Sequence, residues 1–222
     1  MGSRARSVVL LSGGLDSAAN LALCAERDHP VLALTVDYGQ RAARKEIDAA
    51  RSLSAHYGVE HRVLELRWLG ALGGSSLTDT QQDVPELATS QLDDLSVITG
   101  SAAAVWVPNR NGVLINVAAA FAERAGATRV VVGFNAEEAV TFPDNSEDFL
   151  HRATSALALS TSNRASVRCY TVRMNKREIV AELRKLPRPF PFDRIWSCYH
   201  GGEKPCGACE SCRRQARALG GE

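Results

Sequence analysis

Six residues near the start of the chain, Ser-Gly-Gly-Leu-Asp-Ser at positions 12–17, combine small residues, hydroxyls and an acid in one turn. Glycines let backbone N–H groups approach an anion closely, and the start of a helix favours negative charge. Asp16 suits such a site when a cation such as Mg²⁺ bridges its carboxylate to the phosphates. The chain lacks the Gly-Lys-Ser/Thr of a Walker A loop, the G-x-G-x-x-G fingerprint and the G-x-S-x-G elbow. The turn therefore predicts a nucleotide-phosphate site of another type.

Four of the six cysteines lie near the end of the chain with the spacing C-x7-C-x2-C-x2-C. Four thiolates at this spacing suit a closed, tetrahedral Zn²⁺ site of the structural kind. An iron–sulfur cluster is the alternative, because C-x2-C-x2-C also occurs in ferredoxins. The predicted metal ligands are Cys198, Cys206, Cys209 and Cys212, whereas Cys24 and Cys169 lie in apolar stretches and are expected to be buried thiols.

Polar residues also follow two further apolar runs and precede one helical pattern. The carboxyl ends of parallel strands share one edge of a sheet, where ligands bind. Carboxylates there can accept from N–H donors of a ligand, and an arginine suits a phosphate or a carboxylate. The candidates are Asp37, Gln40, Arg110, Asn111, Asn135, Glu137, Glu138 and Asp144.

The elements that must position these residues alternate along the chain. Apolar runs predict strands over residues 8–11, 31–36, 60–66, 129–132 and 167–172. Helical spacing predicts helices from residue 17 onward and over residues 41–57, 112–125 and 175–185, the last with Asn175 and Glu178 as a capping box. Such alternation predicts an α/β fold, a parallel sheet with helices on both faces.

Two stretches interrupt the alternation. Residues 68–105 are rich in glycine and polar residues, and an insertion of this length is typically a lid, a binding loop or disordered. Residues 134–147, which are polar and acidic and directly follow the apolar run at 129–132, are the second stretch. A proline-rich segment after residue 185 ends the α/β pattern. We therefore expect a nucleotide-binding α/β core over residues 1–190, with the insertion at 68–105, and a zinc-binding tail over residues 191–222.

The bulk composition limits the classes of partner. The 222 residues are 45% hydrophobic and 23% charged, with a net charge of +1. This balance is ordinary for a globular protein and argues against nucleic acid as a partner, so Arg213, Arg214 and Arg217 are expected to form a solvent-exposed helix face. No apolar run approaches the length of a membrane span, and the one near the start is too short for a secretory signal. We expect a cytoplasmic protein.

The loop and the tail together resemble those of the 7-cyano-7-deazaguanine synthase family, whose members carry the pyrophosphatase loop of adenylating enzymes. The resemblance covers nearly the whole chain. Its pieces are VVLLSGGLDS (8–17), VDYGQR (36–41), GGSSLTD (73–79), VPNRN (107–111), GFNAEE (133–138), NKREIV (175–180) and WSCYHGGEKPCGACESCR (196–213). It implies an adenine-nucleotide α-hydrolase-like fold and an ATP-dependent carbon–nitrogen ligase, which makes the nitrile precursor of queuosine from 7-carboxy-7-deazaguanine and ammonia.

With this resemblance, each candidate receives an expected role. Residues expected to act in catalysis are Asp16, Ser17, Arg110 and Asp144. Those expected around ATP are Ser12, Gly13, Gly14, Leu15, Asp16, Ser17, Asp37 and Gln40. Those expected around the deazaguanine acid are Asn111, Asn135, Glu137, Glu138 and Asp144. The expected ions are a structural Zn²⁺ and an Mg²⁺ that accompanies ATP.

The chain departs from the family pattern in one loop. Where the family reads NA-x-D-Y-S-G-Y-P-D-C-R, this chain reads NAEEAVTFPDNS over residues 135–146. These changes leave alternatives open: an adenylating enzyme that stops at the amide, or one that passes the activated acid to another amine, such as one on a protein. A tRNA-thiolation enzyme with the same loop and an iron–sulfur cluster is a further alternative. Pairing with a second copy of the chain is also left open.

Overall fold

The computed structural model describes residues 4–220, which form a five-stranded parallel sheet. Its strands are β1 (Arg6–Leu10), β2 (His29–Asp37), β3 (Glu60–Glu65), β4 (Arg129–Val131) and β5 (Ser166–Arg168), in the order β3-β2-β1-β4-β5. The chain runs outward from β1 to β3 on one side and from β4 to β5 on the other. The crevice between β1 and β4 is therefore the topological switch point, where open α/β sheets bind ligands.

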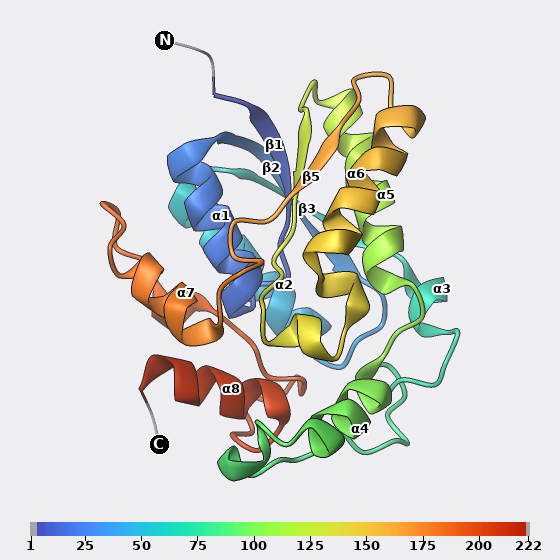
Figure 1. The fold of residues 1–222 in the computed structure, drawn as a ribbon, viewed down its shortest axis with the longest axis vertical. Helices are drawn as coiled ribbons and strands as arrows, with labels where there is room; N and C mark the ends of the chain where they lie inside the picture. The colour runs from blue at the N-terminus through green and yellow to red at the C-terminus, as the bar shows by residue number, and fades with distance from the viewer. Residues whose placement is uncertain (1–3, 221–222) are drawn as a thin grey trace.

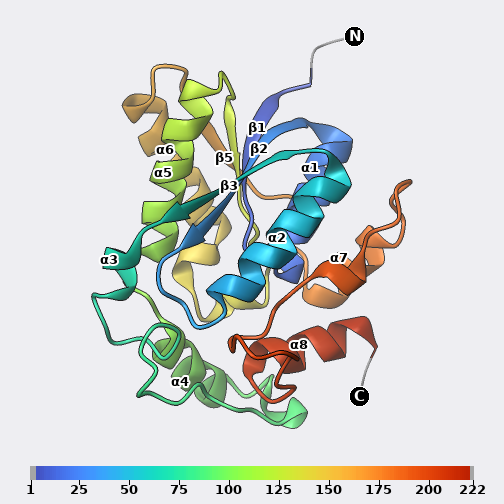
Figure 2. The same cartoon turned by 180° about the vertical axis from the view of Figure 1, so that it is seen from behind.

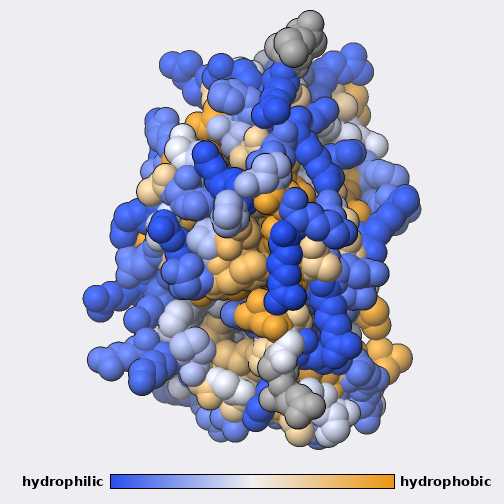
Figure 3. Space-filling view, turned by 90° about the vertical axis from the view of Figure 1, so that its left-hand side faces the viewer, coloured by the Kyte–Doolittle hydropathy of each residue, from blue (hydrophilic) through white to orange (hydrophobic). Residues whose placement is uncertain are grey.

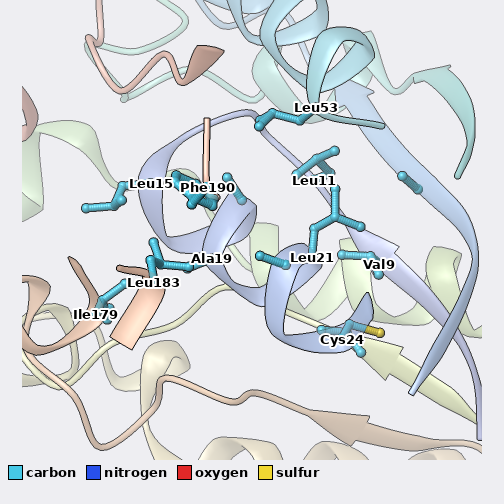
Figure 4. Close-up of a cluster of buried hydrophobic side chains, with 14 of the residues drawn as sticks. Val9, Leu11, Leu15, Ala19, Leu21, Cys24, Leu53, Ile179, Leu183 and Phe190 are labelled. Atoms are coloured by element: carbon cyan, nitrogen blue, oxygen red, sulfur yellow. The ribbon is translucent and has the colours of Figure 1, made fainter. Parts of the chain in front are cut away.

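Helices cover both faces of the sheet, which confirms the predicted fold class (Figures 1 and 2). One face carries α1 (Leu15–Arg27), α2 (Ala43–Tyr57) and α7 (Lys176–Leu183), and the other carries α5 (Arg110–Arg124) and α6 (Glu147–Ser160). Successive residues of β1 point to opposite faces, so Val8 packs beneath α5 and Val9 packs beneath α1. Figure 4 shows the α1 side of this core, with Leu15, Leu21 and Leu183 among the buried side chains.

All five predicted strands form, but the last is shorter than expected. The pattern predicts a strand over residues 167–172, whereas β5 ends at Arg168. Beyond it, the backbone N–H of Tyr170 donates to Oδ1 of Asn20 on α1, at 2.7 Å, and so leaves the ladder. The capping box of Asn175 and Glu178 at the start of α7 forms as predicted.

The insertion is ordered and contains helices that the sequence patterns do not predict. It holds α3 (Arg67–Gly70), a 3-10 turn at Thr89–Gln91 and α4 (Leu95–Val105), which Asp94 caps by accepting from Ser96 and Val97. Helix α6 is also unpredicted. The tail ends in α8 (Glu210–Leu219), and both α4 and α8 lie beyond the carboxyl edge of the sheet (Figure 1). Three further 3-10 turns span Glu138–Val140, Pro143–Asn145 and Phe192–Arg194.

Figure 3 shows the side of the molecule that carries α1, α7 and α8, where hydrophilic residues surround a strip of hydrophobic ones. Within residues 4–220, no helix combines the length and the apolar composition needed to cross a membrane.

Candidate active site and metal centre

Residues 12–17, the phosphate loop, join β1 to the start of α1. Gly13 has a φ of +84°, and a Cβ there would lie 2.8 Å from the Ala49 Cβ and from the Glu46 carbonyl oxygen on α2. A side chain at this position would therefore clash as well as strain the backbone. The loop closes on itself through its hydroxyls, because Oγ of Ser12 and Oγ of Ser17 lie 3.1 Å apart. The first turn of α1 thus presents its backbone N–H groups at the carboxyl edge of the sheet, as predicted.

The end of β4 approaches this loop closely. A Cβ at Gly133 would lie 2.5 Å from the backbone N and Cα of Ser17, so only glycine fits between the strand end and the helix. A cavity opens beside this contact, over the switch point between β1 and β4. Of the predicted site residues, it is lined by Ser12, Gly14, Leu15, Asp16, Ser17, Gln40, Arg110, Asn111 and Glu138.

A buried lysine that the sequence analysis did not single out lies in this cavity. Lys176, the first residue of α7, has a side chain that is 7% exposed and pairs with both Asp16 and Glu138, the latter at 2.9 Å. Burial lowers the pKa of the lysine, but its two carboxylate partners outweigh burial and raise it, so the ammonium stays charged. The capping box at Asn175 and Glu178 was the available signal, since it marks a helix start at the same sheet edge.

Asp16 has one carboxylate oxygen without a hydrogen-bond partner. Its Oδ2 contacts Lys176, whereas its Oδ1 is buried and has no hydrogen-bond partner among the described residues. A buried carboxylate oxygen without a partner is costly, and a divalent cation that accompanies ATP would satisfy it. The donor set at Asp16 therefore fits the predicted Mg²⁺.

Asp16 gives the site a predicted pH dependence. Burial raises the pKa of Asp16 to about 6, and Lys176 acts against that rise. Below this pKa the carboxyl is protonated and loses the charge that faces Lys176 and a cation. We expect kcat/KM for ATP to fall as the pH drops through about 6, and the fall to disappear in Asp16→Asn. A wild-type profile that is flat between pH 5 and pH 7, with the protein still folded, would contradict this assignment.

Arg110 begins α5 and lines the same cavity as the phosphate loop. Its Nη1 donates to the Tyr38 hydroxyl at 3.1 Å, and no carboxylate lies within 4.0 Å of its guanidinium among residues 4–220. Burial raises the pKa of the nearby Asp144 carboxyl, and Arg110 and Asn111 act against that rise. A cation without a paired carboxylate in a cavity suits an anionic ligand.

Some predicted ligands lie outside the cavity lining. Asp37 accepts a hydrogen bond from Arg67 at 2.6 Å, and Asn135 is fully buried and accepts from the backbone N–H of Glu138. Gln40 lines the cavity, but its amide is occupied by Tyr38, Val36 and Glu46. The residues predicted from sequence that the cavity lining leaves out are Gly13, Asp37, Asn135, Glu137 and Asp144.

Glu137 belongs to an ionic network between the loop at residues 135–146 and the tail. Its Oε1 accepts from the backbone N–H of Lys176, and its Oε2 accepts from Arg214 at 2.8 Å and Arg217 at 3.2 Å. Arg214 also pairs with Glu210 at 2.8 Å, and only 6% of its side chain is exposed. The expected solvent-exposed arginine face is therefore wrong for Arg214, because its guanidinium bridges two carboxylates inside the protein. These contacts hold α8 against the start of α7.

Replacing Arg214 tests this network. We expect Arg214→Ala to lower the free energy of unfolding by about 3 kcal/mol, because it leaves Glu137 and Glu210 with fewer partners while still buried. Adding Glu137→Gln should cost less than the sum of the two single changes, since the residues are in direct contact. Chemical denaturation measures both effects, with the exposed Arg177→Ala as the matched control. Additive single effects would contradict the coupling.

The four tail cysteines converge as predicted. Their Sγ atoms all lie within 4.8 Å of one another. A tetrahedral zinc site with Zn–S bonds of about 2.3 Å requires sulfurs roughly 3.8 Å apart. Backbone N–H groups of His200 and Cys206 donate to the Cys198 Sγ at 3.3 Å, an arrangement that suits thiolates. The residues fit a zinc ion held by four thiolates. The other two cysteines, Cys24 and Cys169, are buried as expected.

The tail also forms one wall of the cavity. Trp196, Ser197 and Tyr199 line it, and the backbone N–H of Trp196 donates to the Gly13 carbonyl at 2.9 Å. The sequence predicts a zinc-binding tail over residues 191–222, and no local pattern indicates that this tail contacts the phosphate loop.

Comparison with known proteins agrees with this geometry. A family model described as "Queuosine biosynthesis protein QueC" matches residues 6–221. The 7-cyano-7-deazaguanine synthase of Desulforamulus reducens is 50% identical over 213 residues, which cover 96% of this chain and 92% of that protein. The enzyme of the same name from Methanosarcina mazei is 46% identical over 217 residues, covering 96% and 93%, and that from Bdellovibrio bacteriovorus is 48% identical over 213 residues, covering 96% and 91%. The chain belongs to the QueC family of queuosine biosynthesis proteins.

Proposed function

We propose that this chain is an ATP-dependent ligase that converts 7-carboxy-7-deazaguanine and ammonia into 7-cyano-7-deazaguanine, with release of AMP and pyrophosphate. One observation carries the proposal: a single cavity joins the phosphate loop to the cation of Arg110, in a chain whose relatives are 7-cyano-7-deazaguanine synthases. Phosphate and carboxylate, the two groups that must meet in adenylation, would thus bind in one cavity.

The phosphate side would be held by the loop. Backbone N–H groups of the first turn of α1 suit the phosphate oxygens, and the Lys176 ammonium offsets charge in the same cavity. Asp16 would hold the Mg²⁺, which when bound stabilises the charge that builds on pyrophosphate. An oxygen of the substrate carboxylate attacks the α-phosphorus, the bond to the β-phosphate breaks, and pyrophosphate leaves.

The carboxylate of the deazaguanine acid would be held by Arg110. Its guanidinium orients the carboxylate toward the loop, and Glu138 supplies an acceptor for ring N–H groups. Ammonia displaces AMP from the first adenylate and gives the amide. A second ATP activates the amide oxygen, and loss of AMP leaves the nitrile. Both carboxylate oxygens therefore depart on AMP, a far better leaving group than oxide or hydroxide.

The balance of oxygen atoms defines the test. The protein is incubated with ATP, Mg²⁺, ammonium and 7-carboxy-7-deazaguanine that carries ¹⁸O in both carboxylate positions. Mass spectrometry is expected to find unlabelled nitrile and two labelled AMP molecules for each nitrile formed.

Other products would change the proposal. Accumulation of the amide with one labelled AMP would show that the enzyme stops after the first adenylation. The altered loop at residues 135–146 would then be linked to an amide product instead of a nitrile. Accumulation of the adenylate without amide would indicate that the activated acid is transferred to an amine other than ammonia, such as one on a protein. No labelled AMP at all, with the protein folded and loaded with zinc, would overturn the proposal.

A further inference from the structure

A serine of the metal-binding tail contacts the phosphate loop directly. Ser197 lies next to the cysteine ligand Cys198, and its Oγ accepts a hydrogen bond from the backbone N–H of Leu15 at 3.3 Å. A Cβ at Gly14 would lie 3.7 Å from both this Oγ and the carbonyl oxygen of Trp196. The serine therefore sits at the opening turn of α1, among the N–H groups that face an anion.

The hydroxyl protons of the loop's own serines are already used. Ser17 Oγ donates to the Gly14 carbonyl at 3.1 Å, and it also accepts from the Ser12 backbone N–H. Ser12 Oγ lies 3.1 Å from Ser17 Oγ and accepts from the Gly14 N–H. In contrast, the hydroxyl proton of Ser197 has no acceptor among the residues that the structure describes, and its side chain lines the cavity. Ser197 is thus a free donor beside the loop.

We propose that Ser197 binds the pyrophosphate portion of ATP, its O–H donating to a phosphate oxygen while its Oγ accepts from Leu15. The inference rests on the proposed use of ATP. Its position is fixed from both sides: the Trp196 N–H donates to the Gly13 carbonyl, and the Trp196 indole Nε1 donates to the Cys198 carbonyl at 3.0 Å. Cys198, which is 2% exposed, belongs to the cluster of four cysteines. The tail thereby contributes a hydrogen-bond donor, the Ser197 hydroxyl, to the nucleotide site.

The variant Ser197→Ala removes the donor and leaves the backbone contacts in place. We expect it to weaken binding of inorganic pyrophosphate, measured by calorimetry in the presence of Mg²⁺, by about 10-fold to 100-fold, the range for a hydrogen bond to a charged group. Ser197→Thr keeps the hydroxyl and should bind within about threefold of the wild type. Ser155→Ala, on an exposed turn of α6, is the matched control. The zinc content of all four proteins is expected to be equal.

Two results would overturn the assignment. The first is that Ser197→Ala binds pyrophosphate as tightly as the wild type. The second is that it loses zinc together with pyrophosphate affinity, which would make the serine a purely structural part of the tail. The proposed function fails separately: wild-type protein could bind pyrophosphate in a Ser197-dependent manner and still release no labelled AMP from the deazaguanine acid.

Discussion

Replacing Lys176 with alanine is expected to abolish most adenylation and to destabilise the fold. The change leaves Asp16 and Glu138 together in the cavity without the ammonium that separates their charges. Removing one partner from a buried ion pair costs about 3–5 kcal/mol of folding free energy. Losing a charge-stabilising group in a closed site lowers kcat by about 10²–10³-fold.

The two effects are measured separately. Chemical denaturation reports the free energy of unfolding, and exchange of labelled pyrophosphate into ATP in the presence of the deazaguanine acid reports adenylation. Lys185→Ala is the matched control, because Lys185 pairs with Glu182 at the surface and its side chain is 73% exposed. A Lys176→Ala protein whose exchange rate stays within threefold of the wild type would remove this lysine from the site.

Disrupting the cysteine cluster is expected to have the second-largest effect. Cys212→Ala removes one of four converging sulfurs, and structural zinc sites in peptides contribute apparent binding free energies of about 10–16 kcal/mol. We expect the variant to lose zinc, to unfold at a lower temperature and to bind ATP more weakly, because Trp196, Ser197 and Tyr199 line the cavity.

Metal analysis, thermal unfolding and ATP titration check these outcomes. Cys24→Ala serves as the control, since this buried thiol belongs to α1 and packs in the core, so its loss should leave the zinc content unchanged. The wild-type protein should be colourless and hold one zinc ion per chain. Visible absorbance with stoichiometric iron would replace zinc with an iron–sulfur cluster, and unchanged ATP affinity in zinc-free Cys212→Ala would separate the tail from the cavity.

The phosphate loop and the metal cluster could be predicted because their chemistry is local in the chain. The glycines and hydroxyls of residues 12–17 lie within one turn, and three of the cysteines lie within seven residues of one another. The alternation of strands and helices likewise predicted the parallel sheet. Local patterns of this kind specify which residues lie at the carboxyl edge.

Contacts between distant segments could not be predicted in the same way. Lys176 reaches Asp16 across 160 residues, and nothing in NKREIV indicates which carboxylates its ammonium will meet. Arg214 shares its stretch with other arginines, and only the packing of α8 shows that it is the buried one. The order within the insertion depends on the tail as well, since the Leu87 N–H donates to the Ala208 carbonyl at 3.1 Å.

Helix α6 was missed for a different reason. Its N-terminal signals are present, because Ser146 caps Phe149 and two acidic residues, Glu147 and Asp148, fill the first turn. Residues 134–147 are polar, so the sequence predicts a loop there, although α6 begins at the end of this stretch. The helix contributes few buried side chains, Leu150 and Leu157, so its apolar stripe is narrow.

The hydrogen bond between Leu15 and Ser197 spans 182 positions of the chain, which has a consequence for biosynthesis. The phosphate loop leaves the ribosome long before Ser197, so the wall of the cavity cannot close until the tail has emerged. A nascent chain therefore carries an incomplete cavity until that point. Loading of the metal and completion of that cavity are expected to be among the final events in the maturation of the protein.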